Sequence, residues 1–178
     1  MTTSGAVSHM TPNELFAAIS PELANEILEY THANDKQLYR GAVEVVAQAR
    51  KVRPVFLDRQ PRTERHASMR AILARPSAAM AADNLLRNWL LKKQNEILVE
   101  FLDALKIKHD KGVVENIPPS VDDAELKQAV DALLGKHSPE IVSLYLHAFN
   151  AMDEARWPNL TTMLETDPRL ELPGLAPG

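Results

Sequence analysis

Eight cationic side chains lie between residues 50 and 75 and offer the clearest chemistry in the sequence. Seven of them are arginine, and the only acidic residues among them are Asp58 and Glu64. Arginine presents a planar fork of N–H donors that suits carboxylate and phosphate groups. The segment therefore predicts contacts with anions, either within the fold or on a ligand or partner. The eight are Arg50, Lys51, Arg53, Arg59, Arg62, Arg65, Arg70 and Arg75.

Helical spacing adds a histidine to this basic segment. If a helix begins near Pro61, then Arg62, His66 and Arg70 follow at four-residue intervals. Arg62 and His66 share an arc with Met69 and Leu73. An apolar stripe that includes Arg and His indicates a junction between helices. An unpaired buried charge is prohibitively costly, so an arginine there needs an acidic partner or an anionic ligand. The candidate ligand-binding residues are Arg59, Arg62, Arg65, His66 and Arg70.

Three explanations of the basic segment stay open. The first is an internal ion-pair network, because the acidic last third, residues 94–178, carries 7 basic and 15 acidic groups. The second is a pocket for a phosphate or carboxylate group. The third, a nucleic-acid surface, is the weakest, because single-strand binders stack bases on aromatic residues and only Phe56 lies near the arginines. A sequence pI of 5.9 also disfavours it.

Metal-binding and catalytic motifs are missing from the sequence. The absence of cysteine excludes disulfides, thiolate metal sites and cysteine nucleophiles. Glu29-Tyr30-Thr31-His32 is a lone Glu-x-x-His motif, whereas carboxylate-bridged di-iron bundles need two. There is no Gly-x-Ser-x-Gly motif and no phosphate-binding glycine loop. We predict no catalytic residue, no metal and no cofactor, and we favour a binding protein over an enzyme.

Composition favours an all-α fold. Alanine and leucine are abundant, whereas aromatic residues make up only 5% of the chain, and sheets favour aromatic and β-branched residues. We predict a compact bundle of six to eight helices, with no substantial sheet. Apolar residues recur at helical spacing in segments that follow capping residues or prolines. The expected helices cover residues 12–19, 20–32, 36–50, 61–75, 77–107, 120–134, 139–152 and 158–164.

Some of these segments carry sharper predictions. Proline inside a helix costs about 3 kcal/mol, so a new helix should begin at Ser20-Pro21. Polar residues 92–96 interrupt the 77–107 pattern, but we favour one continuous helix there. The helix over 139–152 is apolar around more than half of its circumference and is the candidate central helix, with His147 facing water.

Other predictions concern single positions. Gly135 should end the helix that begins near residue 120. Trp89 and Trp157 should be core residues, and Val55-Phe56-Leu57 should be a short apolar anchor.

The prolines and the two ends of the chain suggest its domain organisation. Residues 1–9 are interpreted as a vector-derived or disordered leader, 10–172 as a single helical domain, and 173–178 as a frayed tail. Pro76 would also allow two lobes, 11–75 and 77–172. No apolar run reaches the ~18 residues of a membrane-spanning helix, and no secretory signal occurs. Together with the lack of cysteine, this favours the cytoplasm.

The favoured function is a small cytoplasmic helical binding or scaffold module. Its arginine-rich segment, residues 50–75, would pair with an acidic partner or with its own acidic last third. The alternative is an anionic-ligand binding protein or enzyme that uses Arg62, Arg65, His66 and Arg70. Nucleic acid is the weaker alternative and membrane binding is not expected. The wide apolar faces of helices 36–50 and 139–152 also leave room for self-association.

Overall fold

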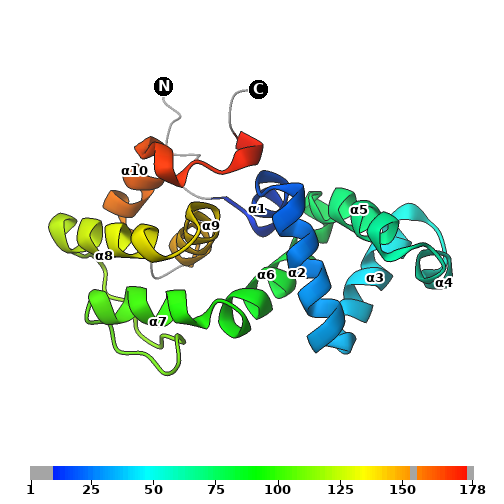
Figure 1. Cartoon of the computed structure of the whole chain (residues 1–178), viewed down its shortest axis with the longest axis horizontal. Helices are drawn as coiled ribbons and strands as arrows, with labels where there is room; N and C mark the ends of the chain where they lie inside the picture. Colours follow the sequence, from blue (N-terminus) through cyan, green and yellow to red (C-terminus); the bar gives the residue numbers. More distant parts are fainter. Residues whose placement is uncertain (1–9, 153–155, 176–178) are drawn as a thin grey trace. The chain divides into compact units, whose positions relative to one another are not determined.

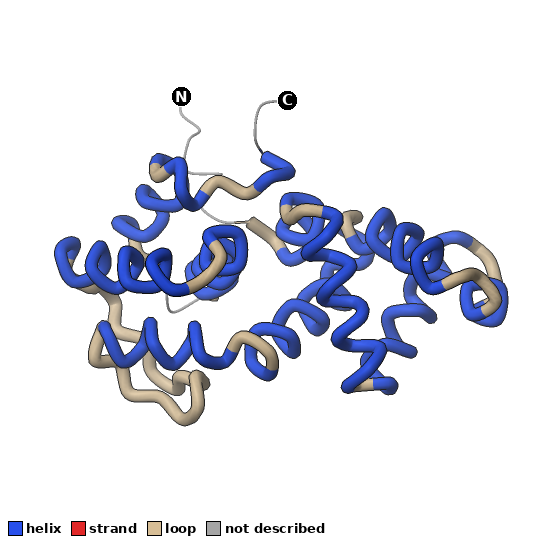
Figure 2. The backbone as a smooth tube through the Cα atoms, viewed as in Figure 1, coloured by secondary structure: helices blue, strands red, loops and turns tan. Residues whose placement is uncertain are grey.

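The computed structural model describes residues 10–152 and 156–175. These residues form ten α-helices and short 3-10 turns, and no strand occurs among them (Figure 2). The all-α prediction is confirmed, but ten α-helices exceed the predicted six to eight. The predicted leader 1–9 and residues 176–178 of the predicted tail lie outside the described residues. No helix in the described part is long and apolar enough to cross a lipid bilayer.

Thr11–Trp89 forms one compact unit. Helix α5 is its centre, because α5 packs against α1, α2 and α3 and buries Met69, Ile72 and Leu73. The basic segment therefore crosses the middle of this unit. Its elements are α1 (Pro12–Ala18), α2 (Pro21–Asn34), α3 (Lys36–Arg50), α4 (Pro54–Asp58), α5 (Arg62–Leu73), a 3-10 turn (Pro76–Ala78) and most of α6 (Ala79–Lys92).

Capping residues set the tight corners of this unit. The Ser20 side chain accepts a hydrogen bond from the backbone N–H of Leu23, which confirms the predicted new helix at this position. The Asp35 side chain accepts one from the N–H of Leu38, so Asp35 alone separates α2 from α3. Lys51 takes a left-handed conformation, with φ 59°, and ends α3. This sharp turn leads directly into α4.

The described residues from Leu90 onward form a second compact unit. Helices α7 and α8 lie side by side and run in opposite directions (Figure 1). Residues 142–147 of α9 are all buried, which confirms α9 as a central helix of this unit. The elements are α7 (Asn95–Ala104), α8 (Asp123–Lys136), α9 (Pro139–Asn150), α10 (Pro158–Thr166) and the 3-10 turns Pro168–Leu170 and Pro173–Leu175.

An aromatic cluster fills the core of this second unit. The ring centroids of Phe101 and Phe149 lie 5.4 Å apart, and those of Phe149 and Trp157 lie 5.1 Å apart. Tyr145 packs edge-on against Phe101 at 5.5 Å. Trp157 and Trp89 are both fully buried, as predicted for core residues.

Four predictions about the helices are wrong. The 77–107 segment contains two helices, α6 and α7, instead of one. Residues 92–96 at their junction have no apolar side chain to bury, and the Asn95 side-chain amide donates to the Lys111 carbonyl. Helix α8 continues through Gly135 to Lys136. His147 is only 9% exposed, because the buried surface of α9 is wider than its apolar arc. In the predicted apolar anchor 55–57, which lies in the short helix Pro54–Asp58, only Leu57 is buried, whereas Val55 and Phe56 are exposed.

Candidate functional site

The guanidinium of Arg65 is held by acceptors of its own unit. Its Nε donates to the Leu57 carbonyl at 3.0 Å, and its Nη2 donates to the carbonyls of Asp58 and Gln60 at 3.0 and 3.1 Å. Its Nη1 donates to the Tyr39 hydroxyl at 3.2 Å. The last carbonyls of a helix lack intrahelical donors, so Arg65 closes the end of α4. It serves the fold with four hydrogen bonds.

His66 continues the same chain of hydrogen bonds. Its ring is 2% exposed, with Nε2 2.8 Å from the Tyr39 hydroxyl and Nδ1 3.0 Å from Asn25 Oδ1. Nδ1 also lies 3.3 Å from Glu29 Oε2. Because both neighbours of Nδ1 are acceptors, Nδ1 carries the hydrogen and Nε2 accepts from Tyr39. Burial, opposed by the charge of Glu29, lowers the pKa of His66 to about 4, so the ring is neutral at pH 7.

The remaining candidate residues, Arg62, Arg59 and Arg70, make fewer polar contacts than Arg65 and His66. Arg62 Nε donates to Glu29 Oε2 at 2.9 Å, and its side chain is 50% exposed. Glu29 belongs to α2 and not to the acidic last third, residues 94–178, where the internal partners were expected. Arg59 is exposed, and the Nε of Arg70 is buried without a hydrogen-bond partner in the described residues. The structure thus joins Arg62, Arg65 and His66, whereas no hydrogen bond of the described residues connects Arg59 or Arg70 to them.

Helix α4 carries the exposed part of the basic segment. Val55 and Phe56 are 46% and 49% exposed, whereas the adjacent Leu57 is buried, so only Leu57 anchors the helix. The guanidinium of Arg50 lies 6.0 Å from the centroid of the Phe56 ring, within range of a cation–π contact. We define the α4 surface as Arg50, Lys51, Arg53, Val55, Phe56 and Arg59. All six residues are exposed, and all except Val55 and Phe56 are cationic.

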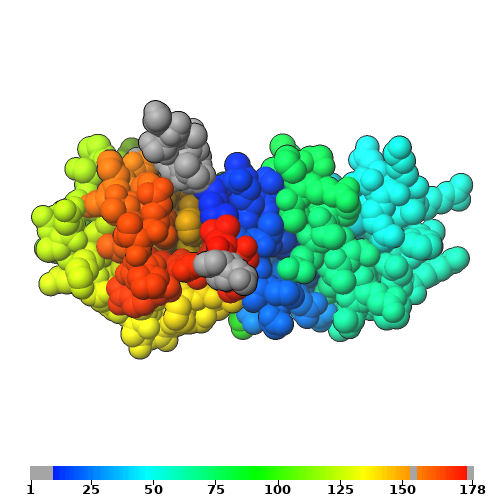
Figure 3. All heavy atoms as spheres, turned by 90° about the horizontal axis from the view of Figure 1, so that it is seen from above, coloured from blue at the N-terminus to red at the C-terminus, as the bar shows by residue number. Residues whose placement is uncertain are grey.

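The α4 surface has an excess of positive charge. The one acidic residue beside it, Asp58, pairs with Arg40 at 2.7 Å, and this hydrogen bond lowers the pKa of Asp58. Within the described residues, no ion pair joins the four cations of the surface to a carboxylate. In Figure 3, long side chains of this part of the chain (cyan to turquoise) project from the molecule.

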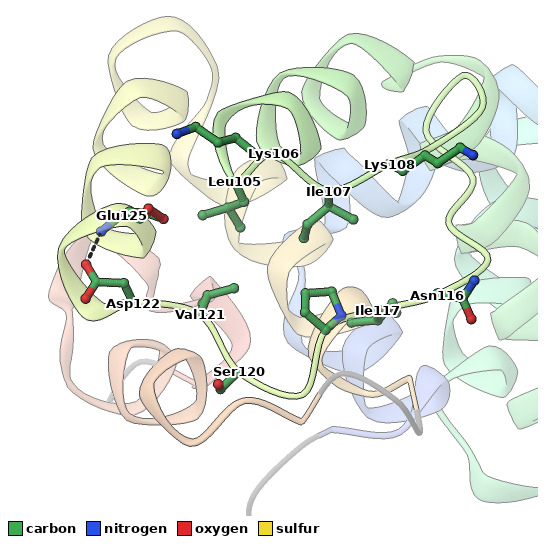
Figure 4. Close-up of a pocket in the computed structure, with 11 residues that line it drawn as sticks. Leu105, Lys106, Ile107, Lys108, Asn116, Ile117, Ser120, Val121, Asp122 and Glu125 are labelled. Atoms are coloured by element: carbon green, nitrogen blue, oxygen red, sulfur yellow. Dashed lines mark hydrogen bonds between the residues drawn. The ribbon is translucent and has the colours of Figure 1, made fainter.

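A hollow of about 490 Å³ lies in the second unit, between the end of α7 and the start of α8. Leu105 and Ile107 face Ile117 and Val121 across it, while the side chains of the lysines at 106 and 108 point away (Figure 4). Polar and apolar residues both line it, and no set of residues with the geometry of a catalytic group is among them. We therefore place the candidate functional site on the α4 surface.

Sequence reasoning missed the residues that complete the polar chain. Asn25 and Tyr39 lie 41 and 27 residues before His66, and no local pattern connects them. It also missed a cluster of Glu96, Glu100 and His137 in the second unit. The exposure of Phe56 could have been suspected, because basic residues surround it on both sides in the sequence.

Comparisons with known proteins add no functional information. No protein-family model, curated protein or solved structure matches this chain.

Proposed function

We propose that the unit Thr11–Trp89 is a protein-binding module whose α4 surface docks an acidic segment of a partner. One observation carries this proposal: Val55 and Phe56 are about half exposed, side by side, among four cations that have no carboxylate partner within the described residues. Exposed apolar patches with polar rims mark interaction sites. Aromatic residues and arginine are enriched where binding energy concentrates.

The geometry favours a partner of defined chemistry. An apolar side chain of the partner would pack on Val55 and Phe56, and carboxylates on either side of it would pair with Arg53 and Arg59. Leu57 is buried and Arg65 closes the end of α4, so the surface is ordered before binding. Preorganisation reduces the conformational entropy that binding must remove.

A protein segment fits this surface better than a nucleic acid. Single-strand binders stack successive bases on several aromatic faces. The α4 surface offers only one aromatic ring, that of Phe56. Binding to an oligonucleotide is therefore the competing outcome that the experiment must distinguish.

Fluorescence anisotropy with three labelled probes tests the proposal. The probes are a short Asp/Glu-rich peptide with one central leucine, the same peptide with alanine in place of leucine, and an oligo(dT) strand. The variants are Phe56→Ala and Arg53→Glu. The matched controls are Met80→Ala, which truncates another exposed apolar side chain, and Arg87→Glu, which reverses another exposed charge of the same unit.

We expect the leucine peptide to bind more tightly than the alanine peptide, and Phe56→Ala to abolish this difference. Arg53→Glu should weaken binding of both peptides about tenfold or more, and added salt should do the same, because charge pairing contributes to both. The two controls should bind like the wild type. Equal binding by Phe56→Ala and Met80→Ala, no binding of the leucine peptide, or tighter binding of oligo(dT) would overturn the proposal.

A further inference from the structure

Two neighbouring helices of the second unit bring together two carboxylates and an imidazole. Glu96 and Glu100 are four residues apart on α7 and therefore share a face. His137 directly follows α8, which packs against α7. One ligand atom from each residue lies within 4.8 Å of the other two. This is the only such group of three found among the described residues.

The imidazole of His137 points into this cluster. Its backbone N–H donates to the Leu133 carbonyl and ends α8, so the ring takes no part in the cap. Its Nε2 lies 3.2 Å from Glu100 Oε1 and 4.0 Å from Glu96 Oε2. The side chains of His137 and Glu100 are 15% and 26% exposed, whereas that of Glu96 is 69% exposed. Two ligands are thus fixed by packing, and the third lies at the solvent edge.

These distances suit a small divalent metal ion. Zinc binds histidine nitrogen and carboxylate oxygen at about 2.0–2.2 Å, so neighbouring ligand atoms around a tetrahedral ion lie ~3.3 Å apart. The separation of His137 Nε2 and Glu100 Oε1 already matches this value. Glu96 is exposed, so a rotation of its side chain can bring its oxygen to the same ion.

We propose that Glu96, Glu100 and His137 form a binding site for a divalent transition-metal ion of the zinc type. The ion replaces the hydrogen that His137 Nε2 shares with Glu100, and the exposed side next to Glu96 leaves a coordination position for water. Imidazole with carboxylate is a ligand set that such ions accept. The site lies outside the unit that carries the α4 surface, so its test does not depend on the proposed function.

Lys136 competes with a metal ion for one of the ligands. Its Nζ lies 3.1 Å from Glu100 Oε2, the oxygen that does not face His137. Glu100 Oε1 is therefore the oxygen available to the ion, and the ammonium charge of Lys136 weakens the attraction of a cation. Removal of this charge should raise the metal affinity, which an ordinary ion-pair network does not require.

A second histidine–carboxylate pair, between the end of α7 and the loop that follows it, provides a matched control. His109 Nε2 lies 2.7 Å from Asp103 Oδ1, and His109 Nδ1 accepts from the N–H of Gly112. No third ligand completes a cluster there among the described residues. Asp103→Asn therefore removes a carboxylate of α7 from its histidine partner without touching the proposed site.

Isothermal titration calorimetry of the full chain with ZnCl₂ tests the proposal. The absorption spectrum of added CoCl₂ and the histidine ¹⁵N resonances provide two structural readouts. We expect one equivalent to bind, with a shift of the His137 Nε2 resonance. Glu100→Gln and His137→Gln should weaken binding at least tenfold, and Glu96→Gln by a smaller factor.

Lys136→Gln, which removes no ligand, should bind several-fold more tightly, and Asp103→Asn should bind like the wild type. Circular dichroism checks that each variant keeps its helices. The proposal is overturned if zinc does not bind, if Glu100→Gln and His137→Gln bind like the wild type, or if Asp103→Asn loses binding equally. A Lys136→Gln variant with unchanged or weaker affinity also contradicts the site.

Discussion

The two units of this protein bury their central side chains in different ways. In Thr11–Trp89, a chain of hydrogen bonds runs from Arg65 through the buried Tyr39 hydroxyl and His66 ring to the exposed Asn25. In the unit from Leu90 onward, the corresponding place is filled by aromatic rings in edge-on and tilted contact. The first arrangement is directional, whereas the second depends mainly on shape and apolar area.

The difference predicts how each core responds to the loss of one polar atom. In a buried polar chain, each group is the partner of the next, so removal of one leaves another unsatisfied. In the aromatic core, the Tyr145 hydroxyl has no hydrogen bond within the described residues, and burial raises the pKa of that hydroxyl. Removal of one polar atom should therefore destabilise the first core far more than the second.

A pair of tyrosine variants tests this contrast most strongly. Tyr39→Phe removes the hydroxyl that joins Arg65 and His66, and should lower the free energy of unfolding of its unit by about 1–3 kcal/mol. Tyr145→Phe should change the free energy of its own unit by less than ~0.5 kcal/mol. Urea denaturation measures both values.

The two tryptophans allow the units to be followed separately. Trp89 belongs to the first unit and Trp157 to the second, and both are fully buried. Fluorescence in a Trp157→Phe background therefore reports on the unit of Tyr39, and Trp89→Phe reports on that of Tyr145. Equal losses for the two tyrosine variants would refute the contrast between the cores.

Two buried histidines extend the comparison to acid pH. Burial, opposed in part by Glu29, lowers the pKa of His66 to about 4, and burial alone lowers the pKa of His147 to about 4. Below pH 6.5 the unfolded chain binds protons that the folded rings do not accept. Stability is therefore full above pH 6.5 and falls as the pH decreases towards 4. Each histidine should account for about 1 kcal/mol at pH 5.5.

Substitution at the two positions should separate these contributions. His66→Gln should reduce the pH dependence of its unit but also its stability at pH 7, because Tyr39 or Asn25 loses a partner. His147→Leu should reduce the pH dependence of the other unit with little loss at pH 7, since that ring has no hydrogen bond among the described residues. Urea midpoints at pH 7 and 5.5 measure this. If both variants kept the pH dependence of stability of the wild type, the prediction would be contradicted.

The sequence predicted the helices better than the contacts between them. Ser20, Asp35 and the prolines act within one turn of the chain, so local patterns revealed where most helices begin. The break near Asn95 escaped prediction because the carbonyl that binds its side chain belongs to Lys111, 16 residues later. The burial of His147 depends on elements packed around α9, which helical periodicity alone does not describe.

For the candidate site too, local features were predicted from the sequence and contacts between elements were not. Composition identified the basic segment and spacing placed Arg62 and His66 on one helix face. The sequence did not reveal that Arg65 would serve four acceptors of its own unit, because these acceptors are backbone carbonyls and a hydroxyl brought close by folding. Which basic residues remain exposed for a partner therefore became clear only from the structure.

The smallest effect is expected at the edge of the polar chain. Arg62 pairs with Glu29, but the two side chains are 50% and 38% exposed, and exposed ion pairs contribute about 0–1 kcal/mol. Arg62→Ala should thus destabilise its unit by less than about 1 kcal/mol, and salt should reduce the difference from wild type. Arg59→Ala, which removes an exposed arginine without an ion pair in the described residues, is the matched control and should have no effect. A loss of several kcal/mol for Arg62→Ala would contradict this prediction, because it would mean that Arg62 contributes to stability as a buried member of the polar chain does.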